Sequence, residues 1–297
     1  MKEVIKRFIP SALKQRIHRF LWAYVRKINL KNVFGFDIYH NSSDTIYYKK
    51  FAGKAISDVA NSSDGRIFHT MDRFIRDGSV AIDVGASIGL MTLVMSKLVG
   101  NNGKVLSFEP GPVSYGLLRR NVFTNVLNGN VTISDNALSD SLGSFNLFLS
   151  PSGESDNQLH KDMAVYTFKD ELPRAKFIVN TQTIDHCLAE NEIDFDRVSF
   201  IKIDTEGHDL FVLRGGRSLF SKATKIAVLV EFAPYLKAWE KITIDEFYNE
   251  LVSLGFDIYD DANLKYGKVD LYYLKSNYGF DKVGKYTDLL LLKGQDL

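Results

Sequence analysis

The 297-residue sequence contains one cysteine, Cys187, and has no excess of charge of either sign. A single cysteine excludes an intrachain disulfide and suits a reducing compartment, so we expect a cytoplasmic protein. The formal net charge of +1 gives the molecule no overall attraction for nucleic acid. What is present, 45% hydrophobic and 25% charged residues, is ordinary for a globular protein with a sizeable core.

The sequence also lacks an apolar run long enough to cross a bilayer. Residues 1–31 are rich in lysine and arginine and place apolar residues at helical spacing, which predicts a basic amphipathic helix. We favour packing of this helix on the domain, with peripheral contact to an anionic membrane surface as the alternative. Residues 1–70 are therefore predicted to be an N-terminal extension, comprising this helix and a hairpin around Gly35, and residues 71–297 the main domain.

From residue 79 onward, short apolar runs alternate with helical segments, which is typical of βαβ units. The predicted strands are residues 80–84, 105–108, 131–134, 200–203, 226–230, 256–259 and 289–292. The predicted helices between them are residues 88–99, 113–125, 183–191 and 244–254. An added strand at 145–149 precedes a polar insertion at 150–174. This pattern predicts an α/β, Rossmann-like, doubly wound sheet of seven strands, with its ligand site at the carboxyl ends of the strands.

A glycine turn follows the first predicted strand and contains Asp83, Gly85, Ala86, Ser87 and Gly89. Gly85 permits a tight turn close to a ligand, and Gly89 permits close packing of helix on strand. Ser87 stands where the dinucleotide-binding pattern requires its second glycine, which argues against NAD or FAD. The carboxylate of Asp83 suits a cofactor that carries an amino-acid moiety.

Glu109 ends the second predicted strand, 20 residues after Gly89. An acid at this spacing can accept hydrogen bonds from both ribose hydroxyls of a nucleoside cofactor. The alternative is a glycine turn followed by an acid that only caps a helix. The combination in a βαβ context favours the cofactor site.

Several segments together resemble the FkbM-type methyltransferase family. They are residues 81–89, 107–110, 136–140 and 200–209, and the last contains the motif Lys-Ile-Asp-x-Glu-Gly. The resemblance implies a class I fold with one antiparallel strand, S-adenosylmethionine as methyl donor, and S-adenosylhomocysteine as product. It also implies O-methylation of a hydroxyl of a sugar, glycan, glycolipid or secondary metabolite, and it places Asn136 and Ala137 near the adenine.

Removing the proton from an alcohol acceptor requires a general base, and Asp204, Glu206 and His208 are the candidates. Asp204 ends the fourth predicted strand and has the best placement, facing the cofactor turn, so it is expected to line the cofactor site as well. Histidine is the residue type whose ordinary pKa lies nearest neutrality, but we favour the interpretation that His208 faces solvent. Glu206 has the alternative of capping the helix that follows.

A metal is not expected in this site, although Asp204, Glu206 and Glu231 would offer oxygen ligands to magnesium or calcium. Nothing in their spacing requires a divalent metal, and the six histidines are too scattered to suggest zinc. The acceptor pocket is expected from insertions at 150–174, 234–240 and 266–286. The aromatic residues of the third insertion could stack on a sugar, but we favour a small satellite core.

Three other functions are weighed against O-methylation of a small-molecule or glycan acceptor. The missing second glycine disfavours an NAD-type Rossmann oxidoreductase. The presence of Asp204 and Glu206 disfavours a non-catalytic S-adenosylmethionine-binding module. A nucleic-acid methyltransferase is disfavoured by the near-neutral charge and by the lack of an Asn/Asp-Pro-Pro-aromatic motif after the fourth strand. The oligomeric state is left open.

Overall fold

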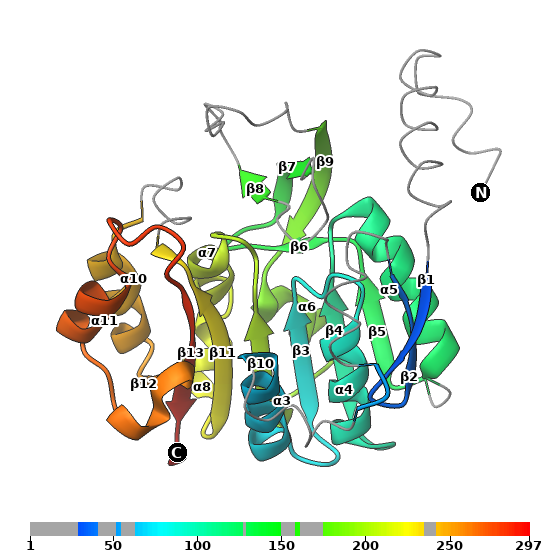
Figure 1. The fold of residues 1–297 in the computed structure, drawn as a ribbon, viewed down its shortest axis with the longest axis horizontal. Helices are drawn as coiled ribbons and strands as arrows, with labels where there is room; N and C mark the ends of the chain where they lie inside the picture. The colour runs from blue at the N-terminus through cyan, green and yellow to red at the C-terminus, as the bar shows by residue number, and fades with distance from the viewer. Residues whose placement is uncertain are drawn as a thin grey trace.

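The computed structural model describes residues 29–40, 52–54, 63–126, 129–149, 158–160, 175–234 and 242–297. A seven-stranded sheet forms its centre, with strand order β12-β13-β11-β10-β3-β4-β5 (Figure 1). Its strands are β3 (Val80–Val84), β4 (Lys104–Phe108), β5 (Val131–Ser134), β10 (Val198–Ile203), β11 (Ile226–Phe232), β12 (Asp257–Asp260) and β13 (Thr287–Lys293).

The direction of the strands confirms the predicted fold class. β3, β4, β5, β10 and β11 pair in parallel, and β13 runs antiparallel to both β11 and β12. The chain leaves β3 toward β4 on one side and returns as β10 on the other. The strand order therefore reverses between β3 and β10, which is where an open α/β sheet places its ligand.

Helices cover both faces of this sheet. Neighbouring residues on a strand alternate between two cores, so that Ile82 and Ile201 face one and Ala81 and Phe200 the other. The first core also includes residues of α6 (Ile184–Glu190), α7 (Asp209–Arg214), α8 (Arg217–Lys222), α10 (Ile244–Ser253) and α11 (Leu271–Tyr278). The second includes residues of α3 (Ser63–Phe74), α4 (Leu90–Val99) and α5 (Pro112–Asn125).

Ahead of the main sheet, β1 (Asn29–Val33) and β2 (Phe36–His40) form an antiparallel hairpin that turns at Gly35, as predicted. The hairpin packs on α5, where the Asn121 side-chain oxygen accepts a hydrogen bond from the Tyr39 amide at 2.7 Å. α3 was not predicted. It runs across the predicted boundary between the extension and the main domain at residues 70 and 71, and it contacts α4 and β10. Residues 1–28 of the predicted basic helix lie outside the described residues, and residues 29–31 belong to strand β1, so the helix prediction is wrong for these three. Within the described ranges, no helix has the length and apolar character needed to cross a membrane.

A second, four-stranded sheet has the order β6-β9-β7-β8 and lies beyond the carboxyl ends of the parallel strands (Figure 1). Its strands are β6 (Ala137–Leu138), β7 (Gly143–Leu149), β8 (Gln158–His160) and β9 (Ala175–Gln182). Only β7 was predicted, as the added strand at 145–149. Most of the predicted insertion at 150–174 lies outside the described residues.

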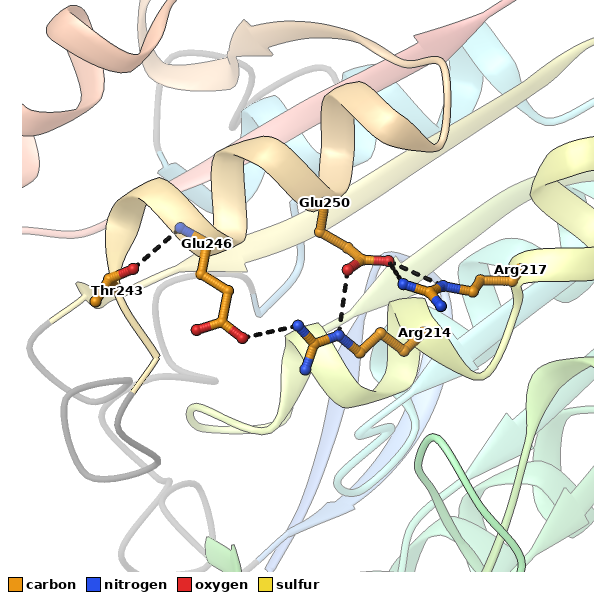
Figure 2. A network of polar contacts seen from close by, with 5 residues as sticks. All are labelled: Arg214, Arg217, Thr243, Glu246 and Glu250. Carbon is orange, nitrogen blue, oxygen red and sulfur yellow. Dashed lines mark hydrogen bonds and ion pairs between the residues drawn. The ribbon is translucent and has the colours of Figure 1, made fainter.

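An ion-pair network joins α10 to the turn between α7 and α8 (Figure 2). Arg214 donates to Glu246 at 2.8 Å and to Glu250 at 3.3 Å, and Arg217 donates to Glu250 through Nε at 3.0 Å. The Thr243 hydroxyl caps α10 by accepting from the Glu246 amide at 3.0 Å. The ion pairs thus attach α10 to α7, the helix that follows the loop at residues 204–208 after β10.

Candidate active site

The glycine turn after β3 has the backbone geometry that its sequence predicts. Gly85 has φ +77°, and a Cβ there would lie 1.8 Å from the carbonyl oxygen of Asp204. Gly89 has φ +93°, and a Cβ there would lie 2.5 Å from Leu118 Cδ1. Ser87 also has a positive φ, +50°. The turn thus depends on left-handed backbone at three positions, and at Gly85 the Asp204 backbone leaves no room for a side chain.

Asp83 is completely buried at the foot of this turn. Its Oδ2 accepts a hydrogen bond from the Thr92 hydroxyl at 2.6 Å, and Thr92 in turn lies 2.8 Å from the Ser107 hydroxyl. Its Oδ1 has no hydrogen-bond partner within the described part of the chain. Burial raises the pKa of Asp83, while the Lys202 ammonium and the Thr92 hydroxyl act to lower it. A buried acceptor oxygen without a partner fits a site built to receive a donor from a ligand.

Lys202, which the sequence analysis did not select, lies beside Asp83. The two residues are paired in register on β10 and β3, and the lysine is only 5% exposed. Its Nζ donates to Asp204 Oδ2 at 2.7 Å. Burial acts to lower the pKa of Lys202, but the carboxylates of Asp204 and Asp83 act to raise it, and the net pKa lies above its ordinary value. The ammonium is therefore held charged by its ion pair with Asp204 and by the nearby charge of Asp83.

Glu109 is buried at the end of β4, next to the glycine turn. Its Oε2 accepts from the Ser87 amide at 2.8 Å and its Oε1 from the Gly111 amide at 2.7 Å. The Glu109 amide donates to the Ser134 carbonyl at 3.0 Å, which joins the ends of β4 and β5. Asn136 and the buried Ala137 follow directly after β5. The predicted ribose and adenine residues therefore lie at adjoining strand ends.

Three carboxylates gather at the carboxyl ends of β10 and β11. One oxygen each of Asp204, Glu206 and Glu231 lies within 4.8 Å of the others. Asp209 holds the loop in shape, because its carboxylate accepts from the Thr205 amide at 3.0 Å and the Thr205 hydroxyl at 2.9 Å. Oxygens at this spacing are compatible with a divalent cation, yet acidic groups also cluster without one, and we assign no ion here.

His208 is 3% exposed, so the expectation that it faces solvent is wrong. Its ring stacks on Phe211 with centroids 4.7 Å apart and meets the edge of Phe145 at 5.9 Å. These aromatic contacts bury the imidazole, and its Nε2 lies 3.0 Å from the Ser139 hydroxyl. His208 thus connects the start of α7 to the second sheet.

The aromatic residues of the insertion at 266–286 divide between the core and the surface, where Tyr266, Phe280 and Tyr286 are exposed. The hydroxyls of Tyr273 and Tyr278 donate to Asp260 Oδ2 at 2.8 and 2.7 Å, and Thr287 donates to Oδ1 at 2.6 Å. Tyr273 belongs to the main core and Tyr278 packs against it, whereas Tyr272 is 78% exposed. The favoured packing interpretation holds for Tyr273 and Tyr278. Residues 235–240 of the second predicted insertion lie outside the described residues.

The strand order with its antiparallel β13, the glycine turn after β3 and the acid after β4 define a class I S-adenosylmethionine-dependent methyltransferase. Residues 83–258 match the family described as the methyltransferase FkbM domain. This match covers more than half of the chain. The chain belongs to the FkbM methyltransferase family.

Two curated fungal relatives are similar over part of the chain. Methyltransferase sdnD of Sordaria araneosa is 29% identical over 153 residues, which cover 45% of this chain and 59% of that protein. Methyltransferase 1 of Beauveria bassiana (strain ARSEF 2860) is 27% identical over 149 residues, which cover 47% of this chain and 59% of that protein. The similarity thus spans less than two thirds of either relative.

Among solved structures, the chain is similar to a putative rRNA-methylase from Clostridium thermocellum. The identity is 12%, the TM-score is 0.44, and the alignment covers 78% of this chain and 96% of that one. A likeness at this level carries no information about the acceptor. The fold assignment therefore stands on the strand order.

Proposed function

We propose that this methyltransferase transfers the methyl group of S-adenosylmethionine to a neutral hydroxyl of a sugar, glycan or secondary metabolite. The observation that carries the proposal is the position of Asp204. Its backbone amide donates to the Val84 carbonyl at 3.0 Å, and its own carbonyl oxygen abuts Gly85. A carboxylate able to act as general base is thereby fixed directly beside the turn that would hold the methyl donor.

The residues around the turn suit S-adenosylmethionine. Asp83 offers a buried acceptor for the amino-acid end, and Glu109 offers a fixed carboxylate for the ribose. Gly85, Ala86, Ser87 and Gly89 form the turn between them, and Asn136 and Ala137 would lie near the adenine. The bound cofactor supplies a methyl group whose sulfur leaving group is already activated by positive charge.

In the proposed reaction, Asp204 accepts the proton of the acceptor hydroxyl while the new oxygen–carbon bond forms and the sulfur–carbon bond breaks. The ion pair with Lys202 engages Oδ2 of Asp204 and fixes the orientation of its carboxylate. Glu206, the second predicted catalytic residue, lies close enough to Asp204 to share the acceptor's hydrogen bonds. His208 is buried against two phenylalanines, and we propose that it supports the loop.

The negative charge at the carboxyl ends of β10 and β11 favours one class of acceptor over another. Three carboxylates converge there, so a phosphate or carboxylate next to the methylated hydroxyl would meet like charge. Neutral polyols are favoured instead, because carboxylates are strong acceptors for hydroxyl groups. We place this activity in the cytoplasm, with contact to a membrane surface through residues 1–28 as the alternative.

The first experiment is a calorimetric titration of the purified protein with S-adenosylmethionine, S-adenosylhomocysteine and NAD, with and without magnesium. Saturable binding of the first two, without NAD binding, is expected. Neutral sugars, glycolipids and hydroxylated metabolites are then screened as acceptors, with release of S-adenosylhomocysteine as the measured signal. Binding of NAD alone would favour the oxidoreductase alternative. Cofactor binding with methylation only at nitrogen, carbon or an acidic acceptor would overturn the neutral-hydroxyl proposal.

A further inference from the structure

Lys202 is a charged residue in a strand whose other members are apolar or hydroxylated. β10 reads Val-Ser-Phe-Ile-Lys-Ile, and every one of its residues is buried. The side chain of Lys202 lies on the same face as Ala81 and Phe200, where the second core ends. Since the lysine is only 5% exposed, its charge depends largely on the groups around it.

Burial of an ammonium costs several kcal/mol, and an ion pair repays that cost only with good geometry. Replacement of a whole buried ion pair by apolar side chains is often neutral or even stabilising. The presence of the pair is therefore weak evidence that Lys202 serves stability alone. Its two neighbours indicate another role, because Asp83 and Asp204 are the carboxylates that the proposed function assigns to the cofactor and the acceptor.

We propose that Lys202 is a positioning residue of this site, whose ammonium orients the Asp204 carboxylate and keeps the buried Asp83 ionised for the amino-acid end of the cofactor. The inference rests on the proposed function. It goes further because one ammonium group would act on both Asp204, the proposed base, and Asp83, the proposed cofactor ligand. None of the residues predicted from the sequence has this role.

The charged groups that act on Lys202 come from several elements. Asp83 belongs to β3, Asp288 to β13, and Asp204 to the loop after β10. From α3, Arg66 acts on Asp288, whereas Thr92 of α4 faces Asp83 as a neutral donor. Removing the ammonium leaves Asp83 with burial and the Asp204 charge, both of which raise its pKa. Asp83 would then hold its proton up to a higher pH, and the cofactor would lose its acceptor there.

The test is calorimetric binding of S-adenosylmethionine and S-adenosylhomocysteine to wild type, Lys202→Met and Lys202→Arg, from mildly acidic to mildly alkaline pH. Lys202→Met is expected to weaken binding about 10- to 100-fold at acidic pH, which is typical of a lost hydrogen bond to a charged group. Affinity should recover as the pH rises. Lys202→Arg keeps the positive charge and should retain most of the wild-type affinity. Lys97→Met, at an exposed lysine, is the matched control.

Lys202 could instead serve only as the ion-pair partner of Asp204. The double variant K202M/D204N, compared with D204N alone, separates this role from an action on Asp83, because it removes both charges of the pair. If Lys202 acts on Asp83, the double variant still binds the cofactor weakly and with the shifted pH dependence. Wild-type affinity and pH dependence in K202M or in the double variant would overturn the inference while leaving the methyltransferase function intact. Failure of the wild type itself to bind S-adenosylmethionine would instead refute the proposed cofactor site, and the inference with it.

Discussion

Two carboxylates flank the glycine turn of β3 from opposite sides, Glu109 at the end of β4 and Asp204 after β10. Glu109 is buried and tied to the turn through the Ser87 amide, whereas the Asp204 side chain is 41% exposed. Burial next to the turn suits cofactor binding, and exposure at the carboxyl ends of the strands suits contact with an acceptor. The two residues are therefore expected to fail in different ways when changed.

Asp204→Asn should leave S-adenosylmethionine binding nearly intact and lower kcat by at least about 100-fold, as expected when a general base is removed. Glu109→Gln should weaken cofactor binding itself by roughly 10- to 100-fold, because a hydrogen bond to a charged group is lost. Calorimetry measures the binding, and release of S-adenosylhomocysteine measures the turnover. The exposed carboxylate Glu190 provides a control as Glu190→Gln. Full turnover in Asp204→Asn would end its assignment as base.

Gly85 and Gly116 provide a matched pair of glycine substitutions. Gly85→Ala puts a Cβ against the Asp204 carbonyl in a left-handed conformation, and should destabilise the fold by at least about 3 kcal/mol. Gly116 lies within α5, where a Cβ meets nothing within 4 Å. Gly116→Ala should stabilise the protein by about 0.5–1 kcal/mol. Urea unfolding measures the stability change of both variants. Equal effects would contradict the close packing of Gly85 against Asp204.

At the residue scale, the predictable part of the site is the part that depends on neighbouring residues in sequence. The positions of Asp83, Gly85 and Glu109 at strand ends and in the turn could be predicted because strand ends and glycine spacing are local patterns. Lys202 could not, because its partners depend on the register between β10 and β3, which are far apart in the chain. The burial of His208 depends on Phe145 of the second sheet, which its own segment does not reveal.

At the scale of elements, the strands of the main sheet were predicted to within two residues because strands buried on both faces are continuous apolar runs. β9 escaped prediction because its apolar core is only Phe177, Ile178 and Val179, with polar residues on both sides. β6 has two residues and exists only through its pairing with β9. Such elements depend on their partners rather than on their own sequence.

The link between α10 and the α7–α8 turn yields a prediction at this scale. Glu250 is 8% exposed and accepts from both Arg214 and Arg217, whereas the side chain of Glu246 is 43% exposed and meets Arg214 alone. Glu250→Gln should therefore lower the free energy of unfolding by about 1–3 kcal/mol. Glu246→Gln should cost less than about 1 kcal/mol. Thermal or urea unfolding measures the difference, and a larger loss in Glu246→Gln would refute this assignment of the network.

At the scale of the whole molecule, buried carboxyl groups make stability depend on pH. Burial and the charge of Asp204 raise the pKa of Asp288 to about 7 from its ordinary 3.8, and burial also raises the pKa of Asp83 and Asp261. A folded-state pKa above the unfolded value gives stability that is complete below the unfolded pKa and is lost as pH rises through the folded pKa. The fold is therefore expected to lose stability as the pH rises from 3.8 to about 7 and Asp288 ionises.

Asp288→Asn cannot ionise, so it should escape this loss. The Tm of the variant should rise relative to wild type as the pH increases from about 5 to about 8, by the equivalent of on the order of 2 kcal/mol. Asp245→Asn serves as the control, because the pKa of Asp245 is lowered by its hydrogen bond from Lys275 and it stays ionised throughout that range. Parallel Tm curves for wild type and Asp288→Asn would contradict the raised pKa.

The hydrogen bond from the Asp204 amide to Val84, with the carbonyl of Asp204 against Gly85, makes the loops after β3 and β10 one mechanical unit. Neither loop can shift without dragging the other, so the spacing between methyl donor and base is inherited with the sheet itself. The second sheet contacts the same region through His208, which meets Phe145 and Ser139. We therefore expect related proteins to change acceptor through substitutions at the edges of this region, and not within the two joined loops.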